Sequence, residues 1–256
     1  MATHVRQFLC LKDNYGVLVR DSETGAAAAI DAPDGAAIIA AAEAEGWTLT
    51  DLLLTHHHAD HTQGAPALKA RYPDLRVWGP GKEAARIAGL DRPLGEGDYA
   101  QVGRLAARVL ETPGHTAGHI AYWFEGDELA FVGDTLFALG CGRVFEAPPA
   151  VMWASLLKLA ALPGSTQVYC GHEYTEANAR FALTIEPDNA VLKARAAEVA
   201  ALRAAGKPTL PTTIAAELAT NPFLRAEEPT VQAAVGMRGA DPAAAFAEIR
   251  SRKDRF

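Results

Sequence analysis

The sequence predicts an α/β fold followed by a C-terminal α-helical domain. In the first two thirds of the chain, short apolar runs typical of β-strands alternate with turns rich in glycine and proline. In the last third, long stretches rich in alanine, leucine and glutamate replace them. We therefore expect one domain over residues 1–172 and a helical domain over residues 173–256. A chain of 256 residues can bury the core that this organisation needs.

The first domain is expected to mix strands and helices. Each expected strand is bounded by glycine, proline, aspartate or asparagine. The strands cover residues 15–20, 27–30, 52–55, 75–78, 105–111, 120–124, 129–132 and 168–170. Helices are expected over residues 35–45, which have helical apolar spacing, and over residues 152–162, which end before Pro163.

The signals after residue 172 are helical. Asp188 and Asn189 can cap a helix that runs through Arg203 and closes at Gly206. Another helix is expected over residues 211–219, because proline is favoured in the first turn of a helix.

The composition indicates a globular protein that acts on a small molecule. A net charge of -7 gives no electrostatic reason to bind nucleic acid or an anionic membrane surface. No apolar stretch approaches membrane-spanning length, and the first residues lack the unbroken apolar run of a secretory signal. The three cysteines are widely spaced, which is typical of a reducing compartment. We expect a cytoplasmic monomer.

Four histidines and one aspartate stand within six residues after the apolar run at 52–54: His56, His57, His58, Asp60 and His61. Imidazole and carboxylate are the ligands of zinc, iron or manganese sites, whereas a solvated polar turn is the alternative interpretation. In extended backbone the side chains at 56, 58 and 60 share one side, and a helical start would instead bring 57 and 61 together. Spacing alone does not choose between these conformations.

Three further polar residues follow apolar runs, and each comes directly after a glycine. They are His115, Asp134 and His172. Glycine lets the backbone turn sharply and approach a neighbour closely. Taken singly, each is an ordinary turn residue, but the repeated arrangement favours metal ligands.

The ordered motifs His-x-His-x-Asp-His, Gly-His-Thr, Gly-Asp-Thr and Gly-His resemble the metallo-β-lactamase superfamily. The resemblance implies an αββα sandwich with a site at one edge of its two sheets. It implies one divalent metal ion on His56, His58 and His115, a second on Asp60, His61 and His172, and Asp134 as the bridge. His57 and His119 are not ligands in this scheme, and His119 is expected beside the site or as a polar residue opening a strand.

Two such ions suit hydrolysis. Two divalent ions about 3.5–4 Å apart can share a hydroxide, because they lower the pKa of the parent water from 15.7 toward ~7. Asp60 and Asp134 are the catalytic residues implied beside this bridging hydroxide. We expect zinc, although a ligand set of nitrogen and oxygen also accepts iron or manganese.

Segments 141–146, 171–175, 218–225 and 250–256 resemble the glyoxalase II family of hydroxyacylglutathione hydrolases. This resemblance implies hydrolysis of S-D-lactoylglutathione to D-lactate and glutathione. It also implies glutathione contacts from Arg143, Tyr174, Arg250 and Lys253. Guanidinium and ammonium groups suit the carboxylates of that tripeptide.

The chain departs from this family pattern at two positions. Arg143 replaces the lysine of better-known members, and Phe145 replaces a tyrosine and so lacks a hydroxyl beside the thiol substrate. Weaker substrate affinity or a broader acyl-thiol preference follows. The alternative for the basic C-terminal segment is a solvated tail.

Other functions are compatible with this fold. One is a glutathione persulfide dioxygenase with a single iron, which needs only two histidines and one aspartate. Another is a lactone or β-lactam hydrolase on the same metals. A third is a catalytically idle binding protein. The full ligand set and the basic C-terminal segment favour the thioesterase.

Overall fold

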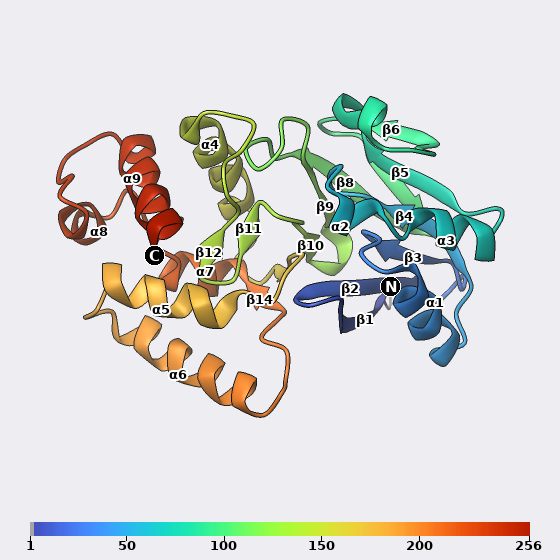
Figure 1. The fold of residues 1–256 in the computed structure, drawn as a ribbon, viewed down its shortest axis with the longest axis horizontal. Helices are drawn as coiled ribbons and strands as arrows, with labels where there is room; N and C mark the ends of the chain where they lie inside the picture. Colours follow the sequence, from blue (N-terminus) through green and yellow to red (C-terminus); the bar gives the residue numbers. More distant parts are fainter. Residues whose placement is uncertain (1–2) are drawn as a thin grey trace. The chain divides into compact units, whose positions relative to one another are not determined.

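The computed structural model describes residues 3–256, and the chain divides into two compact units (Figure 1). The first unit comprises the chain up to Glu111 together with the segment Thr116–Gly133. The second comprises Thr112–His115 and Asp134–Phe256.

A mixed sheet with the order β1-β2-β3-β4-β5-β6 forms much of the first unit. Its strands are β1 (Thr3–Cys10), β2 (Asn14–Asp21), β3 (Ala27–Ile30), β4 (Leu49–Leu53), β5 (Arg76–Pro80) and β6 (Arg92–Leu94). Strands β1 to β3 pair antiparallel, and β3 to β6 pair parallel. Parallel neighbours need crossover connections, which here contain α1 (Gly35–Ala44), α2 (Ala59–Thr62), α3 (Ala65–Arg71) and the 3-10 helix η1 (Gly81–Arg86).

Helices α1 and α3 cover one face of this sheet. Ile38 of α1 and Leu68 of α3 belong to the same buried cluster as Leu18 and Leu52 of the strands. The carboxylate of Asp34 begins α1 by accepting hydrogen bonds from the backbone N–H groups of the first turn. This packing holds the carboxyl ends of β3 and β4 in place, where the polar segments begin.

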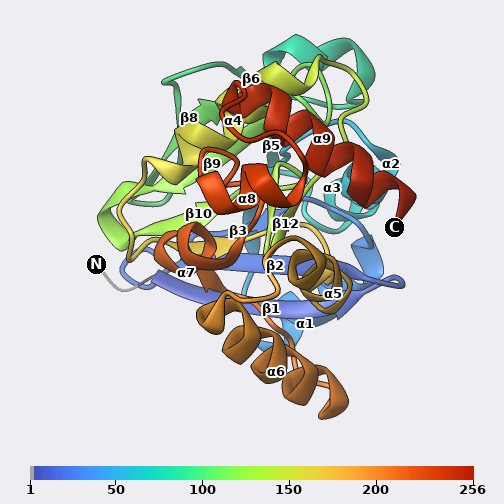
Figure 2. The same ribbon diagram turned by 90° about the vertical axis from the view of Figure 1, so that its left-hand side faces the viewer.

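A second sheet of the first unit contains β7 (Tyr99–Val102), β8 (Leu105–Glu111), β9 (Ile120–Phe124) and β10 (Leu129–Phe131), all antiparallel (Figure 2). The 3-10 helix η2 (Glu125–Asp127) joins β9 to β10. The buried hydroxyl of Tyr122 in β9 donates to the carbonyl of Leu54 after β4, at 2.8 Å. This bond links the second sheet to the first.

The second unit is mainly helical. Its helices are α4 (Pro149–Ala160), α5 (Thr175–Ile185), α6 (Ala190–Ala204), α7 (Ile214–Thr220), α8 (Pro229–Ala234) and α9 (Pro242–Arg255). Figures 1 and 2 both show α5 beside α6. Strands β11 (Leu136–Phe137) and β12 (Gly140–Cys141) form a hairpin, and β13 (Gln167–Tyr169) pairs with β14 (Thr212–Thr213). No helix within residues 3–256 is long and apolar enough to span a bilayer.

Most expected elements are present. The strands at 27–30, 105–111 and 120–124 have the predicted bounds, and Asn189 caps α6 as expected. The helix expected from residue 211 begins instead at Ile214, because Thr212 pairs with β13 and the Thr213 hydroxyl caps the helix. The division between residues 172 and 173 stays a prediction.

Candidate metal centre

The histidine-rich segment combines both conformations that its spacing allowed. The backbone is extended at His58, with φ -58° and ψ 146°, and α2 begins at the next residue. Because of this change, the rings of His56 and His61 meet, with centroids 4.2 Å apart. His56 Nε2 lies 3.1 Å from His58 Nδ1, and His61 Nε2 lies 3.7 Å from Asp60 Oδ2.

A buried carboxylate after β3 orients two of these histidines. Asp31, at φ +57°, accepts hydrogen bonds from His61 Nδ1 at 2.8 Å and from the Thr55 hydroxyl at 2.9 Å. Since the hydroxyl has a single proton and gives it to Asp31, its oxygen accepts from His56 Nδ1 at 3.0 Å. Both histidines are therefore held as tautomers whose Nε2 lone pair is available to a metal.

A second buried residue orients Asp60. The side-chain amide of Asn14, at the start of β2, donates to the Asp60 carbonyl at 3.1 Å and to Asp60 Oδ2 at 3.2 Å. Sequence reasoning missed Asn14 and Asp31. The sequence signal that could have identified them is an Asn or Asp next to a predicted apolar strand, because such a side chain needs a polar partner when it is buried.

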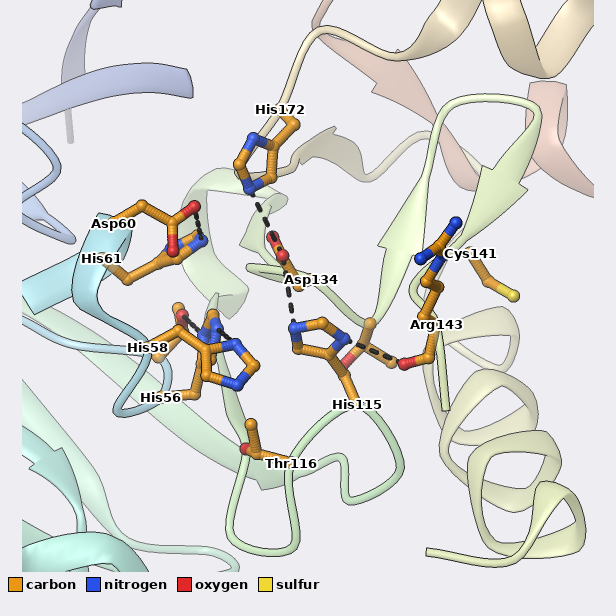
Figure 3. A network of polar contacts seen from close by, with 12 residues as sticks. His56, His58, Asp60, His61, His115, Thr116, Asp134, Cys141, Arg143 and His172 are labelled. Atoms are coloured by element: carbon orange, nitrogen blue, oxygen red, sulfur yellow. Dashed lines mark hydrogen bonds and ion pairs between the residues drawn. The ribbon is translucent and has the colours of Figure 1, made fainter. Parts of the chain in front are cut away.

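The other predicted ligands belong to the second unit and lie around one carboxylate. Asp134 Oδ2 lies 3.3 Å from His172 Nε2 and 3.5 Å from His115 Nε2, as Figure 3 shows. His115 Nδ1 donates to the carbonyl of Arg143 at 2.9 Å, so in the neutral ring the lone pair lies on Nε2. All three ligand side chains are buried.

Gly133, which precedes the predicted ligand Asp134, has a backbone conformation and a close approach that favour glycine, as predicted. Its φ is +47°, and a Cβ atom there would lie 2.5 Å from the Thr55 hydroxyl and 2.7 Å from His119 Nε2. His119 is fully buried, directly precedes β9 and stacks on His56 with centroids 4.8 Å apart. His119 therefore lies beside a predicted ligand.

The donor set fits divalent metal ions. It consists of imidazole nitrogens and carboxylate oxygens, and the chain carries a His/Asp cluster able to hold such ions. The Nδ1 atoms of His56, His61 and His115 are occupied by protein oxygens, as is usual for metal-binding histidines. The cysteines are unsuited to act as nucleophiles, because burial raises the pKa of Cys141 to about 11 and that of Cys170 well above its usual range.

Three of the predicted substrate-binding residues are partly or largely exposed in the second unit. The ring of Tyr174 stacks on His172 with centroids 4.8 Å apart and an interplanar angle of 2°. The ring of Phe145, which is 60% exposed, lies 5.3 Å from that of His115. Arg143 is also exposed, with Nε 3.7 Å from Asp254 Oδ1.

The two predicted cations of α9 differ. Arg250 is buried, and its guanidinium donates to the Cys141 carbonyl and to Asp254 Oδ1, each at 2.9 Å. Lys253 is partly buried, and its Nζ lies 3.3 Å from the Ala177 carbonyl. Burial, together with repulsion from nearby arginines, lowers the pKa of Lys253 to about 8.

Comparison with known proteins shows the superfamily to which the chain belongs. Residues 20–172 match the family model of the metallo-β-lactamase superfamily. The crystal structure of ETHE1 from Myxococcus xanthus superposes with a TM-score of 0.66, at 26% identity over 98% of both chains. The chain belongs to the metallo-β-lactamase superfamily, and the predicted α/β fold class with a C-terminal helical region is confirmed.

The particular family follows from full-length relatives. The hydroxyacylglutathione hydrolase of Rhodopseudomonas palustris (strain BisA53) is 56% identical over 255 residues, and that of Chelativorans sp. (strain BNC1) is 55% identical over 256 residues. Each alignment covers 100% of both chains. Residues 173–256 also match the model of the hydroxyacylglutathione hydrolase C-terminus. The chain therefore belongs to the hydroxyacylglutathione hydrolases, and the dioxygenase and lactonase alternatives are not favoured.

Proposed function

We propose that this protein is a binuclear metal-dependent thioesterase that converts S-D-lactoylglutathione, or another S-2-hydroxyacylglutathione, and water to the 2-hydroxy acid and glutathione. The family supports the substrate class. The observation that carries the chemistry is the orientation of the histidines, since protein oxygens occupy their Nδ1 atoms and leave Nε2 available for a metal.

The proposed ligands are seven histidines and aspartates of the motifs described above. One ion is assigned to His56, His58 and His115, the other to Asp60, His61 and His172, and Asp134 is the bridge. Asp134 would suit the bridging position because its carboxylate is an anionic oxygen ligand and lies near the Nε2 atoms of both His115 and His172. Zinc is the proposed metal. Bound divalent ions would lower the pKa of water and polarise the thioester carbonyl.

Other groups of this chain orient the proposed metal ligands. Asn14 holds Asp60 by one carboxylate oxygen, and the Arg143 carbonyl orients the ring of His115. The leaving thiol of glutathione has an ordinary thiol pKa near ~8.5, so it departs as a thiolate without a strong general acid.

The glutathione part is assigned to the second unit. Arg143, Tyr174, Arg250 and Lys253 are proposed to contact it, with Phe145 at the position where other members carry tyrosine. The cationic groups would pair with the carboxylates of the tripeptide. The phenyl ring of Phe145 supplies apolar contact but no hydrogen bond, which favours a broader range of thiols.

We also propose domain bounds, an oligomeric state and a location for this protein. We place a catalytic domain over residues 1–172 and a substrate-binding helical domain over residues 173–256. The two family models meet at this boundary. We also propose a cytoplasmic monomer that binds neither nucleic acid nor membranes. The net charge of -7 supports the absence of nucleic acid.

The test is hydrolysis of S-D-lactoylglutathione by the purified, zinc-loaded protein, followed by the loss of thioester absorbance. A β-lactam and a lactone serve as control substrates, and Asp134→Ala serves as the inactive control variant. We expect rapid loss of the thioester with the parent protein only. Turnover confined to a control substrate, or oxygen consumption with glutathione persulfide by a protein holding one iron, would contradict the proposal.

A further inference from the structure

A buried glutamate of the first unit binds the two loops that carry three proposed ligands. Glu83 lies in η1 and is 3% exposed. Its Oε2 accepts hydrogen bonds from the backbone N–H and from Nδ1 of His57, both at 2.8 Å. Its Oε1 accepts from the Thr116 hydroxyl and from the backbone N–H of Gly118, the latter at 2.9 Å. The carboxylate thus receives four donors from two loops.

These donors flank proposed ligands in the sequence. His57 stands between His56 and His58, and Thr116 directly follows His115. The His57 ring is bound to Glu83, which accounts for a histidine that is not a predicted ligand within a run of ligands. A Cβ atom at Gly118 would lie 2.6 Å from Glu83 Cγ, so glycine makes room for this carboxylate.

We propose that Glu83 is a positioning residue for the metal ion assigned to His56, His58 and His115. This inference rests on the proposed function. The ligands of the second proposed ion, Asp60, His61 and His172, are held by other groups. Asn14 binds the Asp60 carboxylate, and Asp31 binds the His61 ring. His172 lies outside both loops that Glu83 binds. Loss of the Glu83 carboxylate should therefore weaken one metal site selectively.

The charge and shape of the carboxylate are both needed. Four donors converge on its two oxygens. In Glu83→Gln, one carboxylate oxygen becomes an NH₂ group, which cannot accept a hydrogen bond. The two donors of one loop would then point at another donor. That loop must shift, and the metal ligands attached to it shift as well. Changes to groups that orient metal ligands typically lower metal affinity or activity by about 10- to 100-fold.

The experiment compares Glu83→Gln with Asp51→Asn in the full-length, zinc-loaded protein. Asp51 is a matched control, because it is fully buried in the same unit and accepts hydrogen bonds from Thr50, Arg76 and Trp78 of the first sheet. Metal release to a chromophoric chelator is followed together with metal content and thermal stability.

We expect Glu83→Gln to release one of two zinc ions about 10- to 100-fold faster than the parent, while the second ion leaves at the parental rate. Asp51→Asn should release both ions as the parent does, even with a lower Tm. Thr116→Val removes only one of the four donors and should accelerate the same ion by about 2- to 10-fold. This milder variant keeps the test possible if Glu83→Gln does not fold.

Two outcomes would overturn the role of Glu83. One is parental release of both ions from Glu83→Gln, or from Thr116→Val if the former does not fold. The other is equal acceleration of both ions in Glu83→Gln and Asp51→Asn, which would indicate a general loss of stability. A parent protein that binds fewer than two metal ions would instead contradict the proposed binuclear function, so the two failures are distinguishable.

Discussion

Arg250 and Lys253 lie one turn apart on α9, but their cationic groups have different surroundings. The Arg250 guanidinium lies over the ring of Phe223 and donates to the carbonyl of Cys141 in β12. It therefore stabilises the second unit whether or not it also contacts substrate. The Lys253 ammonium has one backbone contact within hydrogen-bonding range among the described residues, at 3.3 Å. Lys253 is consequently the better probe of glutathione binding.

Lys253→Ala should raise KM for S-D-lactoylglutathione and leave kcat nearly unchanged. A glutathione carboxylate stays ionised from bound substrate to transition state, so an ion pair to it contributes equally to both. A charge-assisted pair contributes about 1.5–3 kcal/mol, which corresponds to a decrease in kcat/KM of about 10- to 150-fold at low salt. Steady-state kinetics provide the measurement.

A small acyl thioester without the tripeptide is the control substrate and should be hydrolysed equally by both proteins. An unchanged KM in a folded Lys253→Ala protein would favour the solvated-tail interpretation of this segment. Arg250→Ala should differ, because it leaves the Cys141 carbonyl without its buried donor and so lowers Tm as well as kcat/KM.

The pH dependence of substrate binding should reflect Lys253. Its pKa is lowered to about 8 by burial first and then by Arg250, Arg180 and Arg143. The ammonium is therefore present below pH 8 and is lost as pH rises through that value. We expect KM of the parent to rise between pH 7 and pH 9, with a flatter profile for Lys253→Arg, whose side chain stays charged. Matching profiles would argue against a role for Lys253 in binding.

At the scale of single elements, the start of α6 offers a test of helix capping. The Asn189 side chain accepts hydrogen bonds from the N–H groups of Val191 and Leu192, each at 3.1 Å. Asn189→Ala should lower the free energy of unfolding by about 1 kcal/mol. Urea denaturation measures this change. Asp188→Ala is the matched control, since its exposed neighbouring carboxylate does not cap α6, and it should stay near the parent value.

The elements that sequence patterns predicted are those with strong local signals. Strands β3, β8 and β9 have apolar residues bounded by turn residues, and their bounds were predicted correctly. Strand β1 was missed because it alternates partly buried and exposed residues such as His4 and Arg6, so its sequence lacks an apolar run. Strand β14 has only two residues and exists through its pairing with β13. Short strands of this kind depend on a distant partner.

At the scale of the whole molecule, metal binding should stabilise the folded state. Since the proposed ligands come from separated parts of the chain, the unfolded protein cannot bind both ions in the same way. We expect a chelator to abolish activity and lower Tm, and zinc to restore both. Calorimetry and elemental analysis should show nearly two ions per parent chain and at most one in Asp134→Ala. Full activity with one tightly bound ion would contradict the binuclear assignment.

The sequence by itself determined the family, the α/β class with its helical C-terminal region, and the candidate ligands. Metal ligands and turn glycines form short motifs, because neighbours in the chain must meet at one site, and such motifs can be read without the fold. Only the tertiary structure decided which groups orient the ligands. Asp31 and Asn14 lie 30 and 46 residues away from the groups that they hold, and Glu83 lies 26 residues from His57. These contacts depend on which strands lie side by side, which no local pattern specifies.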